Sequence, residues 1–97
     1  MPAYMTLSKF TEQGIRNAKD TVNRAKAARQ AVEAAGGKVI GIWWALGQYD
    51  IVQIVEMPDA ETGVRLALAT GMQGNIRTET HQIFSEEEME RIVQGLP

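Results

Sequence analysis

The chain has 97 residues, of which 44% are hydrophobic and 23% charged, and we expect residues 1–97 to form one globular domain. It contains no cysteine, which excludes disulfides, thiolate metal sites and a cysteine nucleophile. The N-terminus has no signal-peptide pattern, and no apolar run approaches the roughly 20 residues that cross a bilayer. We therefore expect a cytoplasmic protein with no membrane partner.

The net charge of −2 is distributed unevenly. Residues 1–38 hold seven Lys/Arg and three Asp/Glu, whereas residues 39–97 hold three and nine. The basic residues fall mostly in one predicted helical region, where they could bind nucleic acid or form a solvated helix face. Acidic residues are interspersed among them and no aromatic side chain lies between them, so we favour the solvated face and expect no nucleic-acid partner.

The first two elements follow from periodicity. Residues 3–8 alternate between apolar and other side chains, which predicts a strand. Apolar residues then recur at steps of three and four from Ile15 to Ala35, which predicts a helix with a break near residues 17–21. Gly36-Gly37 is typical of a helix end.

Residues 38–56 hold two runs of β-branched and aromatic residues on either side of Gly47-Gln48, which predicts a β-hairpin with a two-residue turn. This register pairs Trp44 with Ile51 and Trp43 with Val52. One face then carries Ile40, Ile42, Trp44, Leu46, Tyr49, Ile51, Gln53 and Val55, and the other carries Val39, Gly41, Trp43, Ala45, Asp50, Val52, Ile54 and Glu56. Neither face is polar, so both need cover.

Three further elements complete the chain. Pro58 and Asp59 end the hairpin and begin a helix over residues 60–72, and residues 75–84 alternate as a strand does. Ser85 followed by Glu88 is a capping box, which predicts a short terminal helix.

The predicted order, strand–helix–strand–strand–helix–strand with a short C-terminal helix, indicates an α+β protein with a ferredoxin-like βαββαβ antiparallel sheet. Both long helices would then cover one face of the sheet and leave the other open. An open face rich in Ile, Val and Trp exceeds what soluble monomers tolerate. We therefore expect a homodimer or higher homo-oligomer in which two sheets meet as a dimeric α/β barrel.

The run Gly47-Gln48-Tyr49-Asp50, followed by Ile51–Asp59 and later by Gly74–Thr80, resembles the GYD domain family, and the likeness extends to Thr11–Ile15. This resemblance implies a ferredoxin-like, dimeric α/β-barrel fold without an established activity. Residues 47–84 are also similar to the effector-binding domain of Lrp/AsnC regulators, which bind small molecules, often amino acids, between subunits. The sequence holds no counterpart of their N-terminal helix-turn-helix, so we do not expect DNA binding.

His81 is the only histidine in the chain. It shares one face of the last predicted strand with Arg77 and Glu79, because residues two apart point to the same side. These three side chains could supply a general acid or base in a cavity, or form a solvated charge ladder on an edge strand. We favour the ladder.

Asp50 follows the predicted turn and shares a face with Trp43. A carboxylate near apolar surface could act as an acid or base, or it could accept backbone N–H bonds around the Gly47 turn, which we favour. Tyr49 could orient a ligand, although packing against Leu46 is the commoner role. The spacing of the carboxylates marks no metal site, and we expect no cofactor.

The favoured function is a non-catalytic oligomeric module that binds a small molecule at a subunit interface. The motif residues that could contact such a ligand are Trp43, Gly47, Tyr49, Asp50, Arg77, Glu79 and His81. The alternative is a cofactor-independent dimeric-barrel enzyme, monooxygenase- or isomerase-like, that uses Asp50 or His81 on a small apolar substrate.

Overall fold

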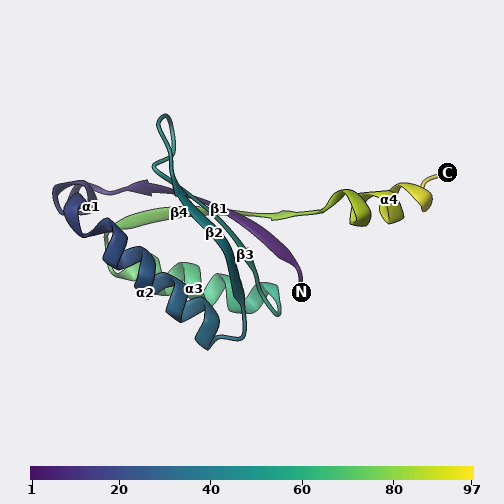
Figure 1. Cartoon of the computed structure of the whole chain (residues 1–97), viewed down its shortest axis with the longest axis horizontal. Helices are drawn as coiled ribbons and strands as arrows, with labels where there is room; N and C mark the ends of the chain where they lie inside the picture. Colours follow the sequence, from purple (N-terminus) through teal and green to yellow (C-terminus); the bar gives the residue numbers. More distant parts are fainter.

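A four-stranded antiparallel sheet in the order β2-β3-β1-β4 forms the centre of the protein, here described by a computed structural model of residues 1–97 (Figure 1). In chain order the elements are β1 (Ala3–Phe10), α1 (Glu12–Arg16), a 3-10 turn (Ala18–Asp20), α2 (Thr21–Ala34), β2 (Lys38–Trp44), β3 (Ile51–Glu56), α3 (Ala60–Met72), β4 (Ile76–Ile83) and α4 (Glu86–Gln94). This is the ferredoxin-like α+β architecture, so the predicted fold class is confirmed. Within one chain the sheet is open and does not close into a barrel.

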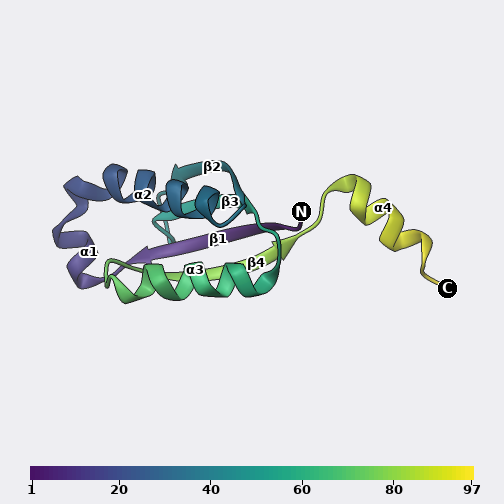
Figure 2. The same cartoon turned by 90° about the horizontal axis from the view of Figure 1, so that it is seen from below.

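The two long helices, α2 and α3, cover the same face of the sheet (Figure 2). Tyr4, Val55 and Val39 lie side by side on three neighbouring strands and are buried beneath these helices. Val32 of α2 and Met57, just after β3, complete this core, and Leu66 of α3 packs against it. The opposite face of the sheet has no helix over it, as the strand–helix order predicts.

The segment after β1 is fixed to the loop before β4. Thr11 caps α1 by accepting a hydrogen bond from the Gly14 amide at 3.0 Å, and its hydroxyl donates to the Gly74 carbonyl at 2.5 Å. A Cβ atom on Gly14 would lie 1.9 Å from the carbonyl oxygen of Asn75, so only glycine permits this approach. The two motif segments Thr11–Ile15 and Gly74–Thr80 are therefore in direct contact, which holds the end of β1 next to the start of β4.

The hairpin differs from its predicted register at one position. Gly41 to Trp44 pair with Ile51 to Ile54 as predicted, but the register shifts at Ile40, where β2 bulges. Val39 therefore lies opposite Val55 and is buried under the helices, although the uninterrupted pattern assigned it to the other face. One extra residue in a strand moves the side chains of all the residues before it to the opposite face of the sheet.

The turn of the hairpin is also longer than predicted. Residues 45–50 form a six-residue loop closed by the Ala45 amide, which donates to the Asp50 carbonyl at 2.9 Å. Gly47 has a φ of +134°, which confirms the positive φ expected there. Leu46 at the tip is fully exposed, at 104% of its reference area, and does not pack on Tyr49. In Figure 1 this loop rises above the sheet, on the side away from α2 and α3.

The C-terminal segment leaves the body of the protein. β4 continues through Phe84 and Ser85 into α4, which lies beyond the end of the sheet in both views (Figures 1 and 2). The predicted capping box is present, with the Ser85 hydroxyl accepting from the Glu88 amide at 3.1 Å and the Glu88 carboxylate accepting from the Ser85 amide at 3.0 Å. None of the helices has the length and apolar character needed to cross a bilayer.

Candidate functional site

The open face of the sheet carries most of the residues selected from the sequence. Its centre is apolar, formed by Met5 and Leu7 of β1 and by Val52 and Ile54 of β3. Trp43 extends this surface across β2, since Trp43, Val52, Leu7 and Glu79 form one row across the four strands. These apolar side chains are half-buried by one another and are covered by no other element.

The two tryptophans face opposite ways, as the alternation predicts. The Trp44 indole N–H donates to the Thr21 hydroxyl at 3.0 Å and ties β2 to the start of α2. Trp43 lies on the open face and is 51% exposed. A Cβ atom on Gly41 would lie 2.4 Å from the Trp43 ring, so the missing side chain leaves room for the indole to lie over the strand. Trp43 is therefore an exposed apolar platform.

A polar cluster borders this apolar surface. The Tyr49 hydroxyl donates to one carboxylate oxygen of Glu79 at 3.3 Å, and the other oxygen pairs with His81 Nε2 at 2.5 Å. Lys9 Nζ lies 5.3 Å from the centre of the Tyr49 ring, a cation–π distance. Three segments far apart in the sequence thus meet at one place on the open face.

The pKa shifts in this cluster follow from these contacts. Partial desolvation and the Glu79 carboxylate raise the pKa of the Tyr49 hydroxyl. The hydrogen bond from His81 is the main factor that lowers the pKa of Glu79, and the Tyr49 hydroxyl and the charge of Lys9 lower it further. Glu79 is therefore held ionised at neutral pH, while Tyr49 stays protonated. The arrangement suits hydrogen bonding better than proton transfer.

Arg77 does not join this cluster. It lies on the same face of β4, opposite Lys9 of β1, and takes part in none of the ion pairs of the protein. β4 is an edge strand, and along it Glu79 pairs with His81 whereas Arg77 pairs with neither. Only this one pair of the charge ladder expected from the sequence is therefore present, and Arg77 is a free cation next to it.

Asp50 has a structural bond. One of its carboxylate oxygens accepts the backbone N–H of Phe10 at 2.8 Å, and its own amide donates to the Ser8 carbonyl at 2.8 Å. The predicted acceptor role is found, but the partner is the end of β1 rather than the Gly47 turn. Asp50 thereby fastens the hairpin loop to the central strand.

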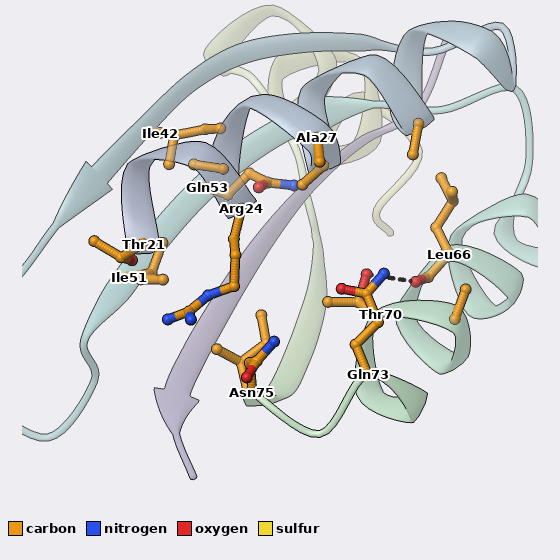
Figure 3. A pocket seen from close by; sticks show the side chains of 15 residues that line it. Thr21, Arg24, Ala27, Ile42, Ile51, Gln53, Leu66, Thr70, Gln73 and Asn75 are labelled. Carbon is orange, nitrogen blue, oxygen red and sulfur yellow. Dashed lines mark hydrogen bonds between the residues drawn. The ribbon is translucent and has the colours of Figure 1, made fainter. Parts of the chain in front are cut away.

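The helix-covered face holds a cavity that the sequence did not indicate. It lies between α2 and α3, has a volume of about 130 Å³, and is walled by small side chains such as Ala25, Ala28 and Ala69 (Figure 3). Arg24 and Gln53 reach toward it in Figure 3, although Arg24 already donates to the carbonyls of Gly14 and Asn17. Its volume is below the roughly 300–1,000 Å³ of typical ligand pockets. The alanine stripe of α2 therefore leaves a small cavity beneath the two helices, with polar as well as apolar side chains in its walls.

Neither this cavity nor a shallow groove of about 320 Å³ between α3 and β4 is lined by Asp50 or His81. No three His, Asp or Glu side chains converge in a way that could hold a metal ion. The chemical groups of the site are thus those of the open face.

The comparison with protein families shows to which family this chain belongs. Residues 4–93 match the GYD domain, which is nearly the whole chain. The chain belongs to the GYD domain family. The resemblance inferred from the Gly47–Asp50 run is therefore confirmed.

A relative of this GYD domain comes from Thermus thermophilus and is named glutamine synthetase and cystathionine beta-lyase binding protein. It is 33% identical over 81 residues, which cover 82% of this chain and 85% of the relative.

Solved structures share the fold. MtbAldR superposes with a TM-score of 0.68 at 10% identity and LrpC of B. subtilis with 0.59 at 13%, each over 88% of this chain. The GYD domain spans only about half of these two proteins, 52% and 51% respectively. TTHA0845 from Thermus thermophilus is covered over 95% of its length and matches 88% of this chain, with a TM-score of 0.55 at 22% identity. The expected relation to Lrp-type regulators thus holds for the fold.

The contribution of β1 to this site is what reasoning from the sequence missed. Lys9 faces Tyr49, and the Phe10 amide holds Asp50, yet neither was selected. The βαββαβ order itself contained the signal, because it places β1 between β3 and β4 and therefore next to the residues of both.

Proposed function

We propose that this GYD domain is a non-catalytic binding module that acts as a homodimer and docks onto a metabolic enzyme. The observation that carries the proposal is the 33% identity to a relative named for binding glutamine synthetase and cystathionine beta-lyase. That identity extends over four fifths of both chains, so the likeness that supports the proposal covers the whole domain rather than one motif.

The state of the polar groups on the open face agrees with a binding role. The Asp50 carboxylate is used by a backbone amide, and the Glu79 carboxylate is shared between Tyr49 and His81. Neither carboxylate lines the cavity between α2 and α3, so within one chain neither is placed as the base of an enclosed active site. The alternative enzyme function would need a cavity that only a second subunit could enclose.

The apolar centre of the open face supports the proposed dimer. Met5, Leu7, Val52 and Ile54 have no cover within the chain, and water in contact with such a surface is unfavourable by roughly 25 cal/mol per Å². A second copy of the same face removes both surfaces from water at once and gives the dimeric α/β barrel. Each subunit then leaves its helix-covered face free for the enzyme partner.

The experiment has two parts. Sedimentation at micromolar concentration is expected to give a dimer, and Val52→Asp is expected to give a monomer because it would bury an unpaired charge at the contact. Calorimetry with glutamine synthetase and with cystathionine beta-lyase from the same source is expected to give a Kd of about 1 µM or tighter for at least one of them. Heat signals absent for both enzymes at about 100 µM would contradict the proposed partner class.

A second candidate is a small molecule held beneath the dimer contact. The observation that favours it is that the open face carries both the hydrogen-bonding cluster Tyr49–Glu79–His81, at the β4 edge, and the aromatic side chain of Trp43, at the β2 edge. Gly47, Asp50 and Arg77 would border this site. Native mass spectrometry of protein purified from its source tests it, since a retained ligand adds its mass to the dimer, and Glu79→Ala would then release it.

A further inference from the structure

Two exposed apolar features of this chain have no partner. The first is the 45–50 loop, where Leu46 is fully exposed at the tip. The second is α4, in which every residue except Glu88 is exposed. Met89 and Ile92 are each 46% exposed and Val93 is 52% exposed, and these three share one side of the helix. A free amphipathic helix of nine residues is too short to be stable in water without packing.

The two features lie at opposite ends of the sheet. Ile83, which leads to α4, pairs with Ala3 at the start of β1, whereas Arg77 pairs with Lys9 at its other end. The 45–50 loop is bound to this second end, where the Asp50 amide donates to Ser8. Eight residues of strand separate the ends by roughly 26 Å. The α4 helix of one chain therefore cannot cover its own loop.

A two-fold axis brings the two features together. In a symmetric contact, residue i of one subunit meets residue j of the other, and the reverse contact follows. When two open faces meet with their strands antiparallel, the loop end of each sheet lies over the α4 end of the other. The loop rises from the open face, toward the position of the second copy, and α4 lies level with its own sheet (Figure 1). Loop and helix would thus meet twice in one dimer.

Charge is complementary at this contact. Residues 85–97 hold four Glu and one Arg, whereas residues 1–84 hold nine Lys/Arg and eight Asp/Glu, so the acidic excess of the chain lies in the C-terminal segment. At the loop end of the sheet, Lys9 and Arg77 lie opposite each other on the open face. The first turn of α4 carries Glu86 and Glu87 without partners in the chain.

We propose that α4 docks against the 45–50 loop of a second copy of this chain. The apolar side of α4, with Met89 and Ile92, packs on Leu46, and the acidic first turn lies near Lys9 and Arg77. The inference rests on the homodimer proposed above, to which it adds a second contact. In this contact the exposed apolar loop tip of one copy and the detached α4 helix of the other cover each other.

Cysteine crosslinking tests the contact directly, because the natural chain has no cysteine. The double variant Leu46→Cys/Ile92→Cys is treated with a short bismaleimide and examined on a denaturing gel. The two single variants are controls, and Val22→Cys/Ile92→Cys is the matched pair, since Val22 is half-exposed on α2 at the helix-covered side. The pair Gln48→Cys/Met89→Cys serves as a second pair in the same two segments.

We expect the loop–helix pairs to give at least about tenfold more covalent dimer than every control, because docked residues react at an effective concentration near the millimolar range. A dimer by sedimentation without this excess overturns the docking of α4 and leaves the homodimer standing. A monomer by sedimentation overturns both. An internal crosslink within one chain also overturns the inference, because α4 would then reach its own loop.

Discussion

Replacing Asp50, the last residue of the Gly47–Asp50 run, distinguishes a structural role of this carboxylate from a catalytic one. The Asp50 carboxylate accepts the Phe10 N–H at 2.8 Å in a partly buried position, and this bond joins the hairpin loop to the end of β1. Hydrogen bonds to charged groups contribute about 1.5–3 kcal/mol and neutral ones about 0.5–1.5 kcal/mol. Asp50→Asn can keep a neutral bond, so it should lower the free energy of unfolding by about 1 kcal/mol.

Asp50→Ala removes the acceptor and leaves the Phe10 N–H unpaired, which should cost about 2 kcal/mol. For a chain of 97 residues, each kcal/mol corresponds to a fall in Tm of about 4–8 °C. Urea denaturation and thermal melting followed by circular dichroism measure both variants. Glu33→Gln, an exposed carboxylate on α2 without a hydrogen-bond partner, is the matched control and should stay within about 0.5 kcal/mol.

The order wild type, Asn, Ala in decreasing stability is the expected result. If both variants melt with wild type, the Phe10 bond contributes nothing and the structural account of Asp50 is wrong. An increase in stability would point the other way, to a carboxylate kept for function at a cost to the fold.

The remaining predictions concern glycines and the terminal helix. Gly47→Ala should lower the free energy of unfolding by about 1 kcal/mol or more, because the φ of Gly47 is +134°. Gly63→Ala within α3 is the control and should raise that free energy by about 0.5–1 kcal/mol, since its Cβ would meet no other atom. Equal effects of the two substitutions in urea denaturation would refute the argument from the backbone angle. Gly14→Ala should cost about 1–3 kcal/mol, since its Cβ would lie 1.9 Å from the Asn75 carbonyl, and a melt like wild type would refute that contact. The hydrogen bond that the Ser85 backbone N–H donates to the Glu88 carboxylate lowers the pKa of Glu88. Its contribution to the stability of α4 is therefore fully present above the unfolded carboxyl pKa of about 4.3 and is lost as the pH falls through the lower folded pKa. Helical NMR shifts of α4 should follow that titration, and Glu88→Gln should abolish it.

Local features were determined by the sequence alone. The Ser85 capping box, the break before α2 and the pairing of Trp43 with Val52 were all predicted, because each depends on residues close together in the chain. The order of the elements was sufficient for the ferredoxin-like sheet and its open face. The sequence also predicted three residues of the polar cluster, Tyr49, Glu79 and His81, as candidate ligand contacts, since residue types and alternation can be read without coordinates.

The tertiary structure decided which side each hairpin residue faces and which partner it meets. A period of two shows which residues share a face, but a bulge at Ile40 reverses the assignment of Val39. Gly41, next to the bulge, is a residue type that often accompanies one, but it does not fix which residue is the extra one. The bonds from Tyr49 to Glu79 and from Phe10 to Asp50 join residues 30 and 40 positions apart. Such contacts depend on which strands are neighbours and on the register between them. Physically, alternation and capping are set by the local backbone, whereas partners across a sheet are set by the packing of the whole chain.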